Sequence, residues 1–328
     1  MLLYLAGFIV SAIALACSSV FLVETLTNIA LKLRISEFLV GFMLVAVGSS
    51  LPELLVGVVA ATEGEPLLSL GNIIGSNIAN LTIVLGIPAL IAGGIRIRSQ
   101  VRNREVIFMN IFAIAPLLLL LDGVLSRGEG VLLLLLFGFY LYNLILRSAS
   151  YTRVMKDPRK KISLPAQLFL FGIGLLALLI SAEILIRSGI VIATALGIPT
   201  ILIGMFVLAL GTSLPELSFD ISAAVKRQGE ILMGETLGSI VSNATLVLGI
   251  TAIIRPITVE NPKILIGSSA VLLLALLVFT LFVRSQYKVS IKEGIVLILG
   301  YLVFVIAVLL FEWQDKSQFL PRLFNPQG

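Results

Sequence analysis

The sequence contains GSSLPE at residues 48–53 and GTSLPE at residues 211–216, so one motif recurs 163 positions further along the chain (211 − 48 = 163). With this offset, residues 38–61 and 201–224 align without a gap and match at 11 of 24 positions. Residues 71–90 and 234–253 match at 10 of 20. Shared apolar composition would not bring Gly, Ser, Pro, Glu and Asn into one register. The chain therefore contains an internal repeat.

The composition is typical of an integral membrane protein. The 328 residues are 59% hydrophobic and only 12% charged, whereas soluble domains carry about 25% charged residues. Each of the long apolar runs covers the roughly 20 residues that cross a bilayer. We expect ten transmembrane helices, near residues 3–30, 36–61, 67–94, 103–121, 128–148, 163–188, 194–225, 231–254, 263–284 and 291–311.

An odd number of spans in each half places the two halves in opposite orientations. Such inverted repeats are typical of secondary transporters, which bind their substrates near the midplane on discontinuous helices. We therefore predict an all-α integral membrane protein of two inverted five-helix repeats with broken helices at the midplane. The repeats are expected at residues 1–148 and 163–312, joined by a basic linker at 149–162 and followed by a tail at 313–328.

The distribution of basic residues predicts the orientation in the cell membrane. If the N-terminus lies outside, most of the 23 lysines and arginines fall in loops on the inside, and five of them lie in the linker YTRVMKDPRKK (151–161). Cytoplasmic loops carry an excess of Lys and Arg. We expect both termini outside and the 149–162 loop in the cytoplasm.

Both copies of the motif predict a break in a membrane helix. Proline removes a backbone N–H and clashes with the preceding turn, and the glycine before it adds flexibility. We expect the breaks near residues 47–50 and 210–213. Carbonyls freed by a break are tolerated in a membrane only where they are buried in protein or line a cavity, and they are hard ligands that suit Na⁺ or Ca²⁺.

Each predicted break is followed by a glutamate, Glu53 or Glu216. An acidic side chain at the bilayer centre costs roughly 2.5–3.5 kcal/mol on insertion scales. No Lys or Arg lies at comparable depth in the matched segments, so a bound cation is the natural counter-charge. The structural alternative is a pair of protonated glutamates that only hydrogen-bond the breaks. Duplication at equivalent positions is hard to explain by packing.

Neutral oxygen ligands accompany the glutamates. A spacing of four places Ser76 with Asn80, and Ser239 with Asn243, on one helix face each. The motifs add four hydroxyls, those of Ser49, Ser50, Thr212 and Ser213. Because Ca²⁺ takes about six to eight oxygens, the set suits one Ca²⁺ or several Na⁺. The absence of His and Cys ligands argues against Zn²⁺ or Cu. The glycines of GNIIG (71–75) and GETLG (234–238) also suit close helix packing.

The motifs, together with GNIIGSNIAN (71–80) and GETLGSIVSN (234–243), resemble the α-repeats of Na⁺/Ca²⁺ exchangers in the cation/calcium exchanger superfamily. The chain lacks the long regulatory loop of the animal members and is similar to a compact prokaryotic form. The resemblance implies a non-enzymatic antiporter that exchanges Ca²⁺ against Na⁺ by alternating access, with the first and sixth helices sliding over the site. No cofactor, nucleic acid or obligate protein partner is expected beside these ions and the lipid bilayer.

The resemblance also implies a ligand set. Glu53 and Glu216 are its central Ca²⁺ ligands. Backbone carbonyls near Ala46, Ser49, Ala209 and Thr212 join them, with the side chains of Ser50, Ser213, Ser76, Ser239, Asn80 and Asn243.

Three positions depart from the family pattern. Asn243 stands where many relatives carry aspartate, Glu235 stands where asparagine is expected, and Asp220 aligns with Gly57. Two glutamates neutralise one Ca²⁺ or two Na⁺, so either the stoichiometry differs or Glu235 or Asp220 compensates. The alternative for both residues is a water-facing position at the pore mouth.

Other functions stay open or are excluded by residue type. A Ca²⁺/H⁺ exchanger of the same superfamily remains an alternative, because glutamates can also carry protons. A cation channel is a second alternative. An intramembrane serine protease is excluded, because the chain contains no histidine for a Ser-His pair.

Overall fold

The computed structural model describes residues 2–32, 46–96, 104–148, 163–196, 200–259, 262–286 and 288–324. The first half contains α1 (Leu2–Lys32), α3 (Ala46–Ser49), α4 (Leu51–Thr62), α5 (Pro66–Ala79), η2 (Asn80–Val84), α6 (Leu85–Ile91), β1 (Ile95–Arg96), α7 (Arg104–Leu119), η3 (Leu120–Asp122), β2 (Val124–Leu125) and α8 (Arg127–Ser148).

The second half contains α9 (Leu164–Leu196), α10 (Thr200–Leu202), η4 (Ile203–Leu208), α11 (Ala209–Thr212), α12 (Leu214–Val225), α13 (Gly229–Ser242), η5 (Asn243–Val247), α14 (Leu248–Ile254), β3 (Ile257–Thr258), α15 (Pro262–Gln286), β4 (Lys288–Val289) and α16 (Ile291–Phe324). The predicted linker at 149–162 lies outside the described residues, as does the end of the tail after residue 324.

Secondary structure repeats at the spacing of the sequence repeat. The segments α3, α4, α5, η2 and α6 recur as α11, α12, α13, η5 and α14, and the boundaries shift by 163 positions in each case (209 − 46 = 163; 254 − 91 = 163). Two short antiparallel pairings also join the halves, β1 with β4 and β2 with β3. The internal repeat is therefore confirmed as a repeat of structure.

Both predicted helix breaks are confirmed. Ser50 separates α3 from α4 with φ −79° and ψ 0°, and Ser213 separates α11 from α12 with φ −85° and ψ 3°. Neither residue has α-helical dihedrals. The helix axis bends by 40° at the second break. In both copies a proline occupies the first turn of the following helix, where its missing N–H needs no partner.

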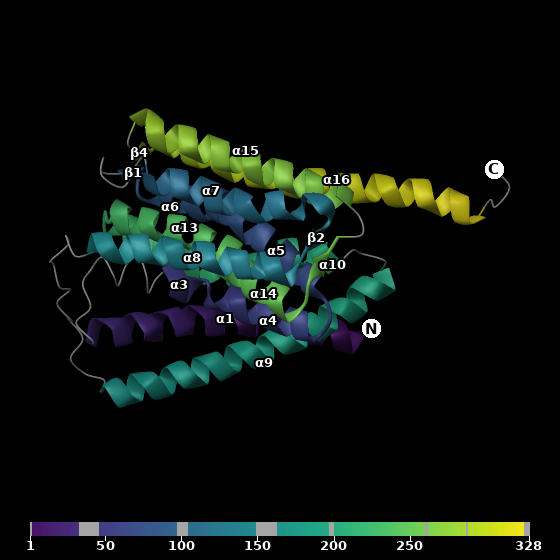
Figure 1. The fold of residues 1–328 in the computed structure, drawn as a ribbon, viewed down its shortest axis with the longest axis horizontal. Coiled ribbons are helices and arrows are strands. Elements are labelled where there is room, and N and C mark those ends of the chain that lie inside the picture. Colours follow the sequence, from purple (N-terminus) through teal and green to yellow (C-terminus); the bar gives the residue numbers. More distant parts are fainter. Residues whose placement is uncertain are drawn as a thin grey trace.

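The span that follows each broken helix lies at the centre of the molecule. The spans Pro66–Ile91 and Leu232–Ile254 are 83% and 78% buried, against 22–39% for the other candidate spans. In Figure 1, α1 and α9 cross one another along the lower side, while α15 and α16 lie along the upper side. The polar repeated segments therefore lie inside, and apolar helices cover them.

The structure supports a multi-pass membrane protein. Among the described residues, six helices are long and apolar enough to span a bilayer, or seven if the bent pair Thr200–Thr212 and Leu214–Val225 is one span. The sequence predicted ten spans, and that number stays a prediction. Part of the expected 36–61 span lies in the undescribed residues 33–45.

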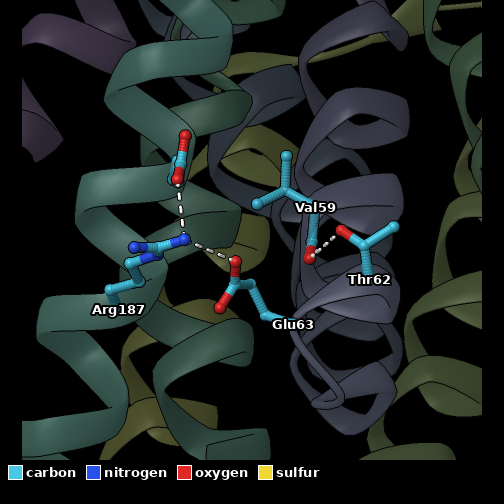
Figure 2. A network of polar contacts seen from close by, with 5 residues as sticks. Val59, Thr62, Glu63 and Arg187 are labelled. Atoms are coloured by element: carbon cyan, nitrogen blue, oxygen red, sulfur yellow. Dashed lines mark hydrogen bonds and ion pairs between the residues drawn. The ribbon is translucent and has the colours of Figure 1, made fainter.

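Arg187 joins the outer helix α9 to the end of α4. Its Nη2 lies 3.0 Å from Glu63 Oε1 and 2.9 Å from Glu183 Oε1 (Figure 2). The side chains are 31–60% exposed, so the contact contributes only about 0–1 kcal/mol to stability. The position of α9 depends mainly on its apolar packing against α1 and α4.

Glycines allow α5 to pack directly against α10 and η4. A Cβ added at Gly71 would lie 2.1 Å from the carbonyl oxygen of Ile201, and one added at Gly75 would lie 2.0 Å from that of Met205. On the opposite side, a Cβ at Gly204 would lie 2.2 Å from the carbonyl oxygen of Leu68. The packing role expected for the glycines of residues 71–75 is therefore confirmed, and it brings the two repeats into backbone contact.

We expect Gly75→Ala to lower the melting temperature of the purified protein. The clashing atom is backbone, which cannot rotate away, and overpacking costs about 1–3 kcal/mol or more. The matched control is Gly172→Ala on α9, because an added Cβ there meets nothing within 4 Å. Equal melting temperatures for the two variants in detergent would show that α5 and η4 do not pack this closely.

Candidate functional site

Four carboxyl groups lie in the buried centre. Glu53 and Asp220 are 0% exposed, Glu216 is 0% exposed and Glu235 is 1% exposed, and they are the buried acids of the described residues. No lysine or arginine of the described residues is buried. An unpaired buried charge is strongly unfavourable, so these carboxyl groups must be protonated or matched by positive charge from another source.

The two motif glutamates approach one another from the two repeats. Each follows the break in its helix, and the carboxyl of Glu216 lies within electrostatic range of Glu53. Glu53 accepts a hydrogen bond from the Ser76 hydroxyl at 3.4 Å. Its Oε2 and both carboxyl oxygens of Glu216 have no hydrogen-bond partner among the described residues. These three oxygens are free to bind a cation.

The hydroxyls at the breaks reach across to the other repeat. Ser49 donates to Glu235 Oε1 at 2.9 Å, and Thr212 donates to Asn72 Oδ1 at 3.3 Å. The two contacts are equivalent, because 212 − 49 and 235 − 72 both equal 163. Each broken helix is thus held against α5 or α13 of the opposite repeat. Thr212 also lies 3.4 Å from Ser76, beside Glu53.

The paired amides also connect the repeats. Asn80 donates to Ser239 Oγ at 3.0 Å, and Asn243 donates to Asn77 Oδ1 at 3.3 Å. Within the described part of the chain, Oδ1 of Asn80 and Oδ1 of Asn243 are buried without a partner. Both residues begin π-helical segments, η2 and η5, and such segments are frequent at functional sites.

The remaining predicted ligands lie at the breaks. Ser50 and Ser213 are buried at the two break positions, and Ala46 and Ala209 begin the helical turns before them. The Ala209 carbonyl accepts hydrogen bonds from the N–H of Ser213 at 3.0 Å and from Thr212 Oγ1 at 3.3 Å. The predicted ligands other than Ala46, of whose side chain nothing is described, are buried, and the role of the set as ion ligands stays a prediction.

Sequence reasoning missed three polar residues of this region. Asn72, Asn77 and Thr236 are buried. Asn72 accepts a hydrogen bond from Thr212 and Asn77 accepts one from Asn243, while Thr236 donates to Asp220. Asn72 could have been found, because it is the repeat partner of Glu235. Asn77 and Thr236 have apolar repeat partners, Ile240 and Ile73, so the repeat carries no signal for them.

Glu235 and Asp220 are fully buried, so a water-facing position is wrong for both. Glu235 accepts from Ser49, and Asp220 Oδ2 accepts from Thr236 Oγ1 at 3.4 Å. Within the described residues, no three acidic, His or Cys side chains converge so that they could hold one metal ion. An ion at the centre would therefore bind two carboxyl groups at most, with neutral oxygens completing its shell.

The family model of sodium/calcium exchanger proteins matches residues 3–146 and 166–310, which covers both repeats. The chain belongs to this family. It is 31% identical to the putative antiporter CaxA of Alkalimonas amylolytica, over 84% of this chain and 89% of that protein. It is 26% identical to the sodium/calcium exchanger MaX1 of Methanosarcina acetivorans, over 88% of this chain and 93% of that protein.

Solved structures agree with this assignment. The structure of the sodium-calcium exchanger NCX_Mj soaked with Na⁺ and Ca²⁺ matches with a TM-score of 0.65 and 29% identity, covering 93% of this chain and 98% of the other. The chain is thus a compact member of the exchanger family with two repeats, and its family is one of ion transporters rather than of enzymes.

We expect Ser239→Ala to lower the melting temperature measured in the presence of a chelator. The change leaves the buried Asn80 amide without its acceptor, which costs about 1–3 kcal/mol. Ser268→Ala is the matched control, since the buried Ser268 hydroxyl donates only within its own helix, to Ile264 O and Leu265 O. Equal melting temperatures for the two variants would show that the hydrogen bond from Asn80 to Ser239 does not stabilise the site.

Proposed function

We propose that this exchanger is an antiporter that moves Ca²⁺ against Na⁺ through a site centred on Glu53 and Glu216. The observation that carries the proposal is the pair of buried glutamates, one after each helix break, with unpartnered oxygens and no buried basic residue in the described chain. Their combined charge of −2 is neutralised by one Ca²⁺ or by two Na⁺. Either substrate therefore matches the charge of these two glutamates.

Neutral groups complete the proposed ion shell. The hydroxyls of Ser76 and Thr212 lie beside Glu53, and Asn80 and Asn243 each have a buried amide oxygen with no partner among described residues. These are the hard oxygen ligands that Na⁺ and Ca²⁺ prefer. Ser50, Ser213 and the carbonyls of Ala46 and Ala209 are the further ligands that we assign at the breaks.

We assign alternating access to the movement of α1 and α9. These two helices pack on one another and touch the parts that carry the glutamates, α1 against α12 and α9 against α4. The five-helix order of each half supports inverted repeats about the site, in a chain of ten spans. Sliding of the pair would open the glutamates to one side of the membrane at a time.

A Ca²⁺/H⁺ exchanger is the second candidate. It is favoured by Asn243, a neutral residue at the position where the family resemblance implies an acidic group in many Na⁺-coupled members. Flux in proteoliposomes separates the candidates. Ca²⁺ uptake driven by an outward Na⁺ gradient at equal pH supports Na⁺ coupling, while uptake driven only by a pH gradient supports proton coupling. Ca²⁺ flux that no counter-ion gradient drives would indicate a channel.

We expect Glu53→Gln and Glu216→Gln each to remove most Ca²⁺ exchange, because the amide keeps the shape but halves the site's negative charge. The measurement is counter-ion-driven ⁴⁵Ca²⁺ uptake at equal amounts of inserted protein. Glu129→Gln serves as the control, since that carboxylate binds Ser126 at the start of α8, away from the centre. Near-normal uptake in either motif variant would overturn the assignment of the site.

The second test concerns orientation. We propose that both termini face outward and that the basic 149–162 loop is cytoplasmic, from the distribution of Lys and Arg. In a Cys17→Ala background, a cysteine introduced by Ser150→Cys should resist an impermeant thiol reagent in intact cells and react after permeabilisation. Labelling in intact cells would mean that the orientation is reversed.

A further inference from the structure

The carboxyl groups of Asp220 on α12 and Glu235 on α13 are neighbours, because the two helices pack together and Asp220 contacts Thr236, the residue after Glu235. Two carboxylates both accept hydrogen bonds, so a direct link between them needs a shared proton or a cation. In the described structure, Oδ1 of Asp220 and Oε2 of Glu235 are buried and have no donor. The pair thus has two buried oxygens without a hydrogen-bond donor among the described residues.

Two hydroxyl groups lie next to the carboxyl oxygens of this pair. Ser49 lies 2.9 Å from Glu235 Oε1, and Thr236 lies 3.4 Å from Asp220 Oδ2. Four carboxyl oxygens and two hydroxyl oxygens make six hard oxygens, the lower end of the number that Ca²⁺ takes. The charge of −2 equals that of a divalent cation with opposite sign.

The pair exists in only one repeat, and the fold explains why. Asp220 corresponds to Gly57 in the first repeat, where an added Cβ would lie 2.8 Å from both Ser69 Oγ and Thr251 Oγ1. Those two hydroxyls bond to one another at 3.0 Å and fill the space. The second member, Glu235, corresponds to the neutral Asn72. The first repeat therefore has neither the charge nor the room for such a pair.

The pair lies beside the central site and is distinct from it in the structure. Asp220 is one turn after Glu216 on the same face of α12, and Glu216 lies within electrostatic range of Asp220 and Glu235. Both oxygens of Glu216 are buried and unpartnered among the described residues. Because no three of the described acids converge on one metal position, a cation between Asp220 and Glu235 would be an ion separate from one held by Glu53 and Glu216.

We propose that Asp220, Glu235, Ser49 and Thr236 form a second divalent-cation site, beside the central one and confined to the second repeat. The proposed function enters only through the choice of Ca²⁺ as the ion. With both sites filled, the four buried carboxylates are neutralised by two Ca²⁺. With only the central site filled, a charge of −2 remains uncompensated unless protons bind.

The experiment counts Ca²⁺ ions bound per chain, by equilibrium dialysis of the purified full-length protein with ⁴⁵Ca²⁺ in Na⁺-free buffer. We expect two ions for the unmodified protein, one for Asp220→Asn/Glu235→Gln, and two for the Glu129→Gln control. Thr236→Val, which removes one hydroxyl and keeps the side-chain shape, should retain two ions but bind one of them at least several-fold more weakly. The melting temperature in chelator confirms that each variant is folded.

Each outcome decides the proposal. One ion in both the unmodified protein and the double variant would overturn it, as the pair would then hold a proton. Loss of all binding in the double variant would also overturn it, by showing a single shared site. The failure of the proposed function looks different: Glu53→Gln/Glu216→Gln would still bind both ions, while the Asp220/Glu235 variant loses one.

Discussion

The burial of negative charge without buried positive charge is the constraint on which this structure depends. A lone carboxylate in a low-dielectric interior is so unfavourable that it must be neutralised or paired, and here four of them share one region. Ordinary proteins solve this problem with lysine or arginine. A transporter gains from leaving the counter-charge out, because a fixed side chain would occupy the place that a mobile ion must enter and leave.

The breaks and the glycines can be understood from this constraint. The interruptions at Ser50 and Ser213 break each helix three residues before its buried glutamate, and hydroxyls lie directly at both breaks. Gly71, Gly75 and Gly204 let the repeats touch along their backbones, so that ligands from both halves come within reach of each other. Hydrogen bonds between the two repeats, such as the one from Asn80 to Ser239, then fix how one repeat is aligned on the other.

The sequence predicted features that are duplicated and failed on features that are not. The repeat, both breaks and the burial of Glu53 and Glu216 follow from residues that appear twice at one spacing, which apolar composition alone does not produce. The positions of Asp220 and Glu235 depend on which face of α12 meets which face of α13, and that is decided by packing over many residues. Asn77 opposite Asn243 is of the same kind. The number of spans stays a prediction, because part of the expected 36–61 span lies outside the described residues.

The two repeats have the same order of helical segments but differ in charge, and this difference affects the conformations that they adopt. If the two repeats are inverted and exchange conformations as proposed, a symmetric protein would have outward-facing and inward-facing states of equal energy. In this chain, both members of the extra acidic pair lie on α12 and α13 of the second repeat, while its partners in the first repeat are Gly57 and Asn72. An ion bound to that pair can stabilise only the conformation that the second repeat adopts. Occupancy there would therefore favour one facing state over the other, even though Glu53 and Glu216 contribute equally from both repeats.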